Sequence, residues 1–293
     1  MRLSMPTSVL DARFSYDRIW DMMAEVGFDA IDLTLTNIMS ESHPLAGNNH
    51  VKKAEKLRES AQSRGLVFNQ AHAPFPIYRE GDEEYNRLVY AALIRSMEIA
   101  SIVGAQQIVV HPSRVPENPM RFNMDFYRGL IPYCERFGIR VAIENLYGYG
   151  ENGTLVMGVC STSQELCTYI DTLDSPWFAV CLDIGHSGLT GQSAAEMIHT
   201  LTATRLKALH VHDNDLIKDL HTLPFTGKLD WEGTTSALRD IGYSGDLTLE
   251  ANLFLNRFPD ELILPAMRLM AETGRYLIQQ CQSEQAKDEG EHA

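Results

Sequence analysis

The chain repeats one pattern of hydrophobic and polar positions along most of its length. A segment with helical, amphipathic spacing ends at a glycine, and a short apolar run follows at once. This occurs at residues 17–35, 52–72, 93–112, 126–145 and 234–252. A glycine in this place is typical of a helix that ends in a left-handed residue, and the apolar run after it is typical of a strand. The pattern therefore predicts alternating helices and strands.

The apolar runs are nearly continuous and rich in Val, Ile and Leu, as expected for parallel strands that are covered on both faces. Their spacing of roughly 30 to 40 residues fits one strand and one helix for each unit. Such units in a chain of 293 residues predict a (β/α)8 TIM barrel. A doubly wound open sheet is the structural alternative. The runs begin near Leu3, Ile31, Val67, Ile108, Val141, Val180, Ala208 and Leu247.

The domain organisation follows from the lack of any break in this pattern. Neither a linker nor a low-complexity segment interrupts the chain. We expect one barrel domain over residues 1–281. The polar residues 282–293 are expected to form a frayed C-terminal tail.

Composition and charge narrow the range of partners. The chain is 44% hydrophobic and 22% charged, which is ordinary for a soluble globular protein. A net charge of −14 argues against non-specific binding of nucleic acid, because affinity for phosphates depends on Lys and Arg. The five cysteines include no CxxC pair, which fits a reducing cytoplasm. No apolar stretch approaches the roughly 20 residues of a membrane helix, so no membrane partner is expected.

Polar side chains follow six consecutive apolar runs, beginning with the third. In a barrel of this type, the active site is built at the carboxyl ends of the strands. We therefore expect these side chains to face one another around the barrel axis. In chain order they are His72, His111, Glu144, Asp183 with His186, His210 with His212 and Asp213, and Glu250.

Each of these residues taken alone has an ordinary structural explanation. A lone His is usually a hydrogen-bonded structural residue, and Asp183 precedes a helix-like segment that it would cap. Several carboxylates and imidazoles gathered around one axis would repel one another or be poorly solvated without a cation. The mixture of oxygen and imidazole donors, without cysteine, predicts a divalent metal: Mn²⁺ first, with Mg²⁺, Co²⁺ or Zn²⁺ as alternatives.

Four motifs, "IEN", "CLDIGH", "HVHDN" and "GKLDW", resemble those of the xylose isomerase-like TIM barrels. That superfamily includes sugar isomerases and epimerases, the inosose dehydratase group and endonuclease IV. The resemblance extends from "HAPF" to "LTLEAN". It implies a four-ligand metal site, in which His210 is preferred over His212 because it begins an H-x-x-D pattern. The implied ligands are Glu144, Asp183, His210 and Glu250.

The resemblance also implies a mechanism. The metal would hold two adjacent substrate oxygens and stabilise the enediolate that forms when the C–H beside a carbonyl loses its proton. Glu144 and Glu250 would act as the acid/base pair, and His186 would bind substrate. The implied activity is that of an isomerase or epimerase of a sugar, sugar phosphate or polyol. A dehydratase of the same fold would share the enolising step and then expel a hydroxyl.

Further residues match the ligand pattern of endonuclease IV, which makes a zinc phosphodiesterase the third alternative. The acidity of the chain and the lack of a basic, aromatic-interleaved stripe argue against it. We expect these residues to bind substrate hydroxyls, with a second metal or no role as open alternatives. The candidate substrate-binding residues, besides His186, are His72, His111, His212, Asp219 and His221.

Two positions depart from the ketose epimerases that the chain resembles. Those enzymes carry an additional Glu after the ligand of the fifth strand. Here the nearest candidate for this substrate-binding position is Glu151, one residue out of register. The Arg expected after the seventh-strand ligand is absent, and only Lys218 is nearby. The expected partner is a small sugar or polyol, and whether the chain forms a homo-oligomer stays open.

Overall fold

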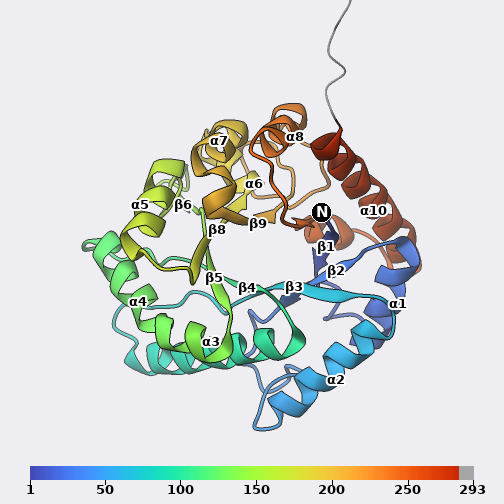
Figure 1. Ribbon diagram of the computed structural model, residues 1–293, viewed down its shortest axis with the longest axis horizontal. Coiled ribbons are helices and arrows are strands. Elements are labelled where there is room, and N and C mark those ends of the chain that lie inside the picture. Colours follow the sequence, from blue (N-terminus) through green and yellow to red (C-terminus); the bar gives the residue numbers. More distant parts are fainter. Residues whose placement is uncertain (284–293) are drawn as a thin grey trace, which may run out of the picture.

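A computed structural model describes residues 1–283. Eight parallel strands run around a central axis, in the order β10-β1-β2-β3-β4-β5-β8-β9, inside a ring of helices (Figure 1). A parallel bridge between Val211 and Leu249 joins the two ends of this sheet. The (β/α)8 barrel is therefore confirmed over the open sheet. Its strands are β1 (Leu3–Pro6), β2 (Ala30–Thr34), β3 (Val67–His72), β4 (Gln107–Val110), β5 (Arg140–Glu144), β8 (Phe178–Asp183), β9 (Leu206–His210) and β10 (Leu247–Thr248).

The helices end largely as the glycine pattern predicts. Gly27, Gly104 and Gly138 adopt left-handed backbone conformations directly after α1, α3 and α4. The exceptions are α2, which ends at Gln62, three residues before Gly65, and α8, which ends at Asp240, two residues before Gly242. The helices are α1 (Tyr16–Val26), α2 (His50–Gln62), α3 (Glu83–Val103), α4 (Pro119–Phe137), α5 (Ser163–Leu173), α6 (Ile184–Leu189), α7 (Ala194–Arg205), α8 (Trp231–Asp240), α9 (Asn252–Leu255) and α10 (Asp260–Gln282).

The apolar core lies mainly between the strands and the surrounding helices, and the barrel interior holds smaller and more polar side chains. Val109, Ala142, Cys181 and Ala208 form a separate interior cluster. Strand residues on either side of them, such as Ile108, belong to the outer core. This alternation follows from the two-residue period of a strand. Because the outer layer supplies most of the apolar burial, residues at the barrel rim are free to serve chemistry.

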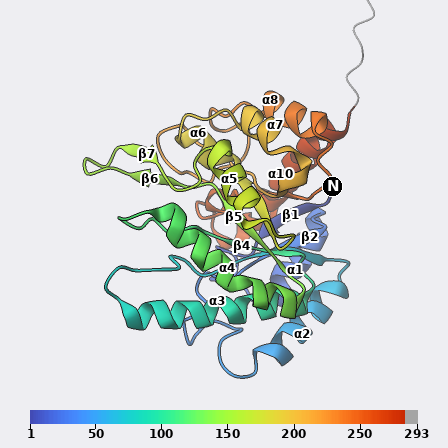
Figure 2. The same ribbon diagram turned by 60° about the vertical axis from the view of Figure 1, so that its left-hand side comes forward.

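A hairpin that the hydrophobic pattern does not predict follows β5. Its strands, β6 (Tyr147–Tyr149) and β7 (Leu155–Met157), pair antiparallel and project beyond the barrel (Figure 2). At the other end of the chain, α10 continues to Gln282. Most of the predicted tail, residues 282–293, lies outside the described residues. No helix within residues 1–283 is long and apolar enough to span a membrane.

Candidate active site

A cavity of about 500 Å³ opens at the carboxyl ends of the barrel strands. Seven of the eleven predicted site residues line it, and three others, Asp183, His210 and His212, are fully buried beside it. The structure thus brings ten of the eleven to one place. The seven that line the cavity are His72, His111, Glu144, His186, Asp219, His221 and Glu250.

One nitrogen of His210 is the point on which the predicted metal ligands converge. His210 Nδ1 lies 3.2 Å from Glu250 Oε2, 3.4 Å from Glu144 Oε2 and 4.0 Å from Asp183 Oδ2. Two ligand atoms that each lie about 2.1 Å from one ion are roughly 3.0 to 3.4 Å apart. This nitrogen has no hydrogen-bond partner among the described residues, although the side chain is fully buried. The distances to Glu144 and Glu250 fit a shared divalent cation, and Asp183 lies slightly farther out.

Strand ends and one asparagine set this geometry. Glu144, Asp183 and His210 are the last residues of β5, β8 and β9, and Asp183 pairs in register with His210. The Asn145 side chain locks two strand ends together, because its Nδ2 donates to Asp183 O at 2.9 Å and its Oδ1 accepts from Asp183 N at 2.7 Å. Asp183 also caps α6 by accepting from His186 N at 2.7 Å. Asp183 therefore both caps α6 and faces the candidate site.

Histidines surround the two most buried carboxylates of this group, Glu144 and Asp183, and shift their pKa values. Burial raises the pKa of Glu144, but His111 and His210 outweigh burial and hold that pKa well below its usual range. Burial likewise raises the pKa of Asp183, and His186 and His212 lower it further than burial raises it. Burial lowers the pKa of His210, yet Cys181, Glu250 and Glu144 together raise that pKa well above its usual value. The histidines thus favour the charged forms of Glu144 and Asp183.

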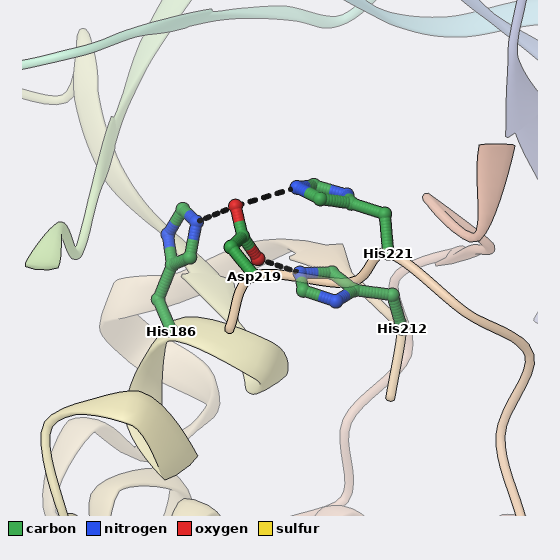
Figure 3. A group of neighbouring side chains, drawn as sticks. All are labelled: His186, His212, Asp219 and His221. Atoms are coloured by element: carbon green, nitrogen blue, oxygen red, sulfur yellow. Dashed lines mark hydrogen bonds and ion pairs between the residues drawn. The ribbon is translucent and has the colours of Figure 1, made fainter. Parts of the chain in front are cut away.

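A second group of three histidines surrounds the carboxylate of Asp219 (Figure 3). Asp219 Oδ2 lies 3.0 Å from His221 Nε2 and 3.6 Å from His186 Nε2, and its Oδ1 lies 3.8 Å from His212 Nε2. Against the effect of burial, neighbouring carboxylates raise the pKa of His186 to about 10 and that of His221 to about 9. These four side chains could hold a cation or present donors to substrate hydroxyls.

A third group shares Glu144 with the first. His72 Nε2 lies 3.1 Å from His111 Nε2, and Glu144 Oε2 is 3.7 Å from the former and 3.0 Å from the latter. Burial lowers the pKa of His111, whereas Glu144 outweighs burial and raises that of His72. The three ligand atoms lie close enough together for a cation. All three groups therefore contribute side chains to one cavity.

Comparison with known proteins identifies the family. A family model described as "Xylose isomerase-like TIM barrel" matches residues 20–272. The chain belongs to this family. The uncharacterized protein MJ1311 of Methanocaldococcus jannaschii is 25% identical over 241 residues, covering 78% of this chain and 77% of that protein.

Two solved structures share the fold of this chain. The IOLI protein with a binding zinc atom superposes with a TM-score of 0.76 at 16% identity, covering 97% of this chain and 100% of its own. D-Psicose 3-epimerase with D-tagatose, from Clostridium cellulolyticum H10, gives 0.74 at 15% identity, covering 95% of this chain and 99% of its own. At these identities the likeness is one of fold.

Glu151 is the predicted site residue that the structure does not bring to the cavity. It lies exposed in the turn between β6 and β7. The hairpin carries this turn away from the barrel, so the expected epimerase-like role has no structural support. Tyr147, at the base of the same hairpin, instead lines the cavity and donates to Asp219 Oδ2 at 3.2 Å.

Two aspartates have roles that the strand-end pattern does not indicate. Asp32 lines the cavity but lies within the apolar run of β2, so reading only the residues after each run misses it. A carboxylate inside an apolar run was the available signal. Asp213, the last residue of the H-x-x-D pattern, instead organises a loop: it accepts from Trp231 Nε1 at 2.9 Å and from Leu229 N at 3.1 Å. Asp213 and Trp231, the tryptophan of "GKLDW", thus share a structural role.

Proposed function

We propose that the protein is a metal-dependent isomerase or epimerase of an uncharged sugar or polyol. The observation that carries this proposal is the convergence of three carboxylates on the unpartnered Nδ1 of His210, beside a cavity large enough for a sugar. Glu144, Asp183, His210 and Glu250 would hold the metal. A divalent ion there would supply Lewis-acid polarisation of a substrate carbonyl. Mn²⁺ suits this oxygen-rich donor set, and Zn²⁺, Co²⁺ and Mg²⁺ are alternatives.

Two glutamates are placed to move a proton. Glu144 ends β5 and Glu250 follows β10, and these strands are separated by β8 and β9 on one side of the barrel. The two carboxylates therefore reach the cavity from different directions. One would take the proton from the carbon beside the carbonyl, and the other would return it. Return to the neighbouring carbon gives isomerisation, and return to the opposite face gives epimerisation.

The cavity lining favours an uncharged substrate. Four carboxylates line it, and none of the lining residues in the described part of the chain is Lys or Arg. A phosphate group in this cavity would face those carboxylates without the permanent cations that usually bind it. Ser8, Thr34 and Asn252 offer donors and acceptors suited to hydroxyl groups, and Phe75 offers an apolar face.

Two other functions use the same residues. A dehydratase would share the first proton transfer and then expel water. A zinc phosphodiesterase is favoured by the three ligand groups around one cavity, but it would have to grip a DNA backbone with a protein of net charge −14. The sugar isomerase or epimerase is therefore our preferred function.

The experiment is a metal-removal and substrate screen. The chelated protein and protein reloaded with Mn²⁺, Co²⁺, Mg²⁺ or Zn²⁺ are incubated with free ketoses, their phosphates and keto-polyols, and the products are analysed by NMR and mass spectrometry. We expect conversion of an unphosphorylated substrate without change of mass, lost on chelation and restored by metal. A product lighter by one water would establish the dehydratase. Failure to bind any of the four metals would overturn the proposal.

A further inference from the structure

A buried carboxylate that the proposed proton transfer does not use faces the ring of His210. Asp32 is 1% exposed, and its Oδ2 lies 3.6 Å from His210 Nε2. This nitrogen is on the opposite side of the ring from Nδ1, on which Glu144 and Glu250 converge. We propose that Asp32 is a positioning residue that holds the His210 ring with Nδ1 free to bind the metal. This inference rests on the proposed metal site.

The two ring nitrogens of His210 cannot both serve the metal. A neutral imidazole carries one proton, so a ring that offers bare Nδ1 to a cation must keep its proton on Nε2. Asp32 is the carboxylate that faces Nε2 within the described residues. A movement of about 0.5 Å brings this pair within hydrogen-bond distance. A carboxylate there favours the metal-binding tautomer and fixes the plane of the ring.

A bulge in β3 supplies a hydrogen-bond partner that holds the Asp32 carboxylate. Ile31 pairs with Phe68 and Asp32 pairs with Gln70, which leaves Asn69 as an extra residue in β3. Gln70 Nε2 donates to Asp32 Oδ2 at 3.0 Å. Bulges beside active sites commonly re-aim a side chain, and here the bulge places an amide behind the carboxylate. A chain of contacts thus runs from Gln70 through Asp32 to His210.

Asn69 uses the same bulge for a separate purpose. Its Oδ1 accepts from Ser4 Oγ at 2.8 Å, and its Nδ2 donates to Thr248 Oγ1 at 3.2 Å. Two consecutive residues of β3 therefore make two different polar contacts inside the barrel. One contact ties strands together, and the other supports the ring that would bind the metal.

A positioning role and a direct catalytic role for Asp32 predict different measurements. If Asp32 acts on substrate, its substitution should lower kcat even at saturating metal and should leave metal affinity unchanged. If Asp32 orients a metal ligand, its substitution should weaken metal binding, and turnover should recover when the metal concentration is raised to saturation. Partners of metal-bound histidines typically change metal affinity by about 10- to 100-fold.

The test measures metal affinity without substrate, by competition of Mn²⁺ and Zn²⁺ with a chelator. The variants are Asp32→Asn and Asp32→Ala, with Gln70→Ala as a milder change that leaves the carboxylate in place. We expect the Asp32 variants to bind both metals about 10- to 100-fold more weakly, and Gln70→Ala to bind a few-fold more weakly. The visible spectrum of bound Co²⁺ should also change, because the ligand ring is no longer held in one orientation.

A matched control comes from the same stretch of chain. Asp29 directly precedes β2 and pairs with Arg275. Asp29→Asn should leave metal affinity unchanged, and thermal melting of the metal-free variants checks that each one folds. Wild-type affinity and an unchanged Co²⁺ spectrum in Asp32→Asn and Gln70→Ala would overturn this inference alone. A wild-type protein that binds no metal would overturn the proposed function and this inference together.

Discussion

Carboxylates have different cationic partners at the two ends of the barrel. Near the amino ends of the strands, Arg2 pairs with Asp246 through two hydrogen bonds of 3.0 and 2.7 Å, and Arg275 lies 2.7 Å from Asp29. At the carboxyl ends, the carboxylates have histidine partners, as His111 shows at 3.0 Å from Glu144. The amino-end pairs are partly exposed, whereas Glu144 and Asp183 are almost completely buried.

The side chain that pairs with the carboxylate, arginine or histidine, distinguishes a structural ion pair from a candidate site. Arginine is always protonated, so a carboxylate paired with it is satisfied permanently. An imidazolium can give up its proton, and the freed nitrogen can then bind a metal beside the same carboxylate. The amino end is therefore suited to stability alone. The carboxyl end can exchange protons for a metal ion.

The largest expected effect at the carboxyl end is on turnover. Glu144→Gln and Glu250→Gln should each lower kcat by about 10²- to 10⁴-fold, because an amide cannot shuttle a proton. KM should change far less, since the amide oxygen can still face the metal. Steady-state kinetics at saturating metal measures both. Near-normal turnover in Glu250→Gln would leave that residue, at most, a metal ligand.

The next effect is on metal content. His210→Ala and Asp183→Asn should lose bound metal while the protein stays folded, because the ligands lie at a rim above a separate apolar core. Metal analysis after gel filtration, together with circular dichroism, measures the two properties. Full metal occupancy in both variants would remove these residues from the site.

A smaller effect is expected in the group around Asp219. If this group binds substrate hydroxyls, His221→Ala should raise KM by about tenfold, the equivalent of one hydrogen bond, and metal content should stay at one ion per chain. Metal analysis and kinetics at saturating metal decide this. Three zinc ions per chain, together with cutting of abasic-site DNA, would instead support the phosphodiesterase.

The smallest effect is expected at the amino end. Asp29→Asn should lower the free energy of unfolding by only about 0.2–1 kcal/mol, because the pair is partly exposed. Burial raises the pKa of Asp29, but Arg275 and Leu3 N outweigh burial and lower it. The stabilisation is therefore present above about pH 4 and is lost as the pH falls through the lowered value. Thermal melting of wild type and variant between about pH 2 and 7 checks this; a difference that persists at the acid end would contradict it.

Sequence patterns locate the fold and most of the site because both depend on local rules. Apolar runs after helix-ending glycines mark the strands, and barrel geometry places the residues after them around one cavity. Asp32 escapes this rule because it lies within the apolar run of β2 and not after it, between Ile31 and Leu33 of the outer core. Glu151 lies away from the cavity because the hairpin after β5 carries it outward. Which group binds metal depends on distances between strands, which sequence spacing does not give.

The central claim is that this cavity transfers a proton beside the carbonyl of an uncharged sugar when metal is bound. The most direct measurement is NMR of free ketoses, including D-fructose and D-tagatose, incubated in D₂O with metal-loaded protein. The account predicts deuterium at the carbon beside the carbonyl without loss of water, and no exchange after chelation or in a Glu144→Gln, Glu250→Gln double variant. Metal-loaded protein that exchanges no deuterium into any uncharged ketose or keto-polyol, or that exchanges equally well after chelation, would contradict it.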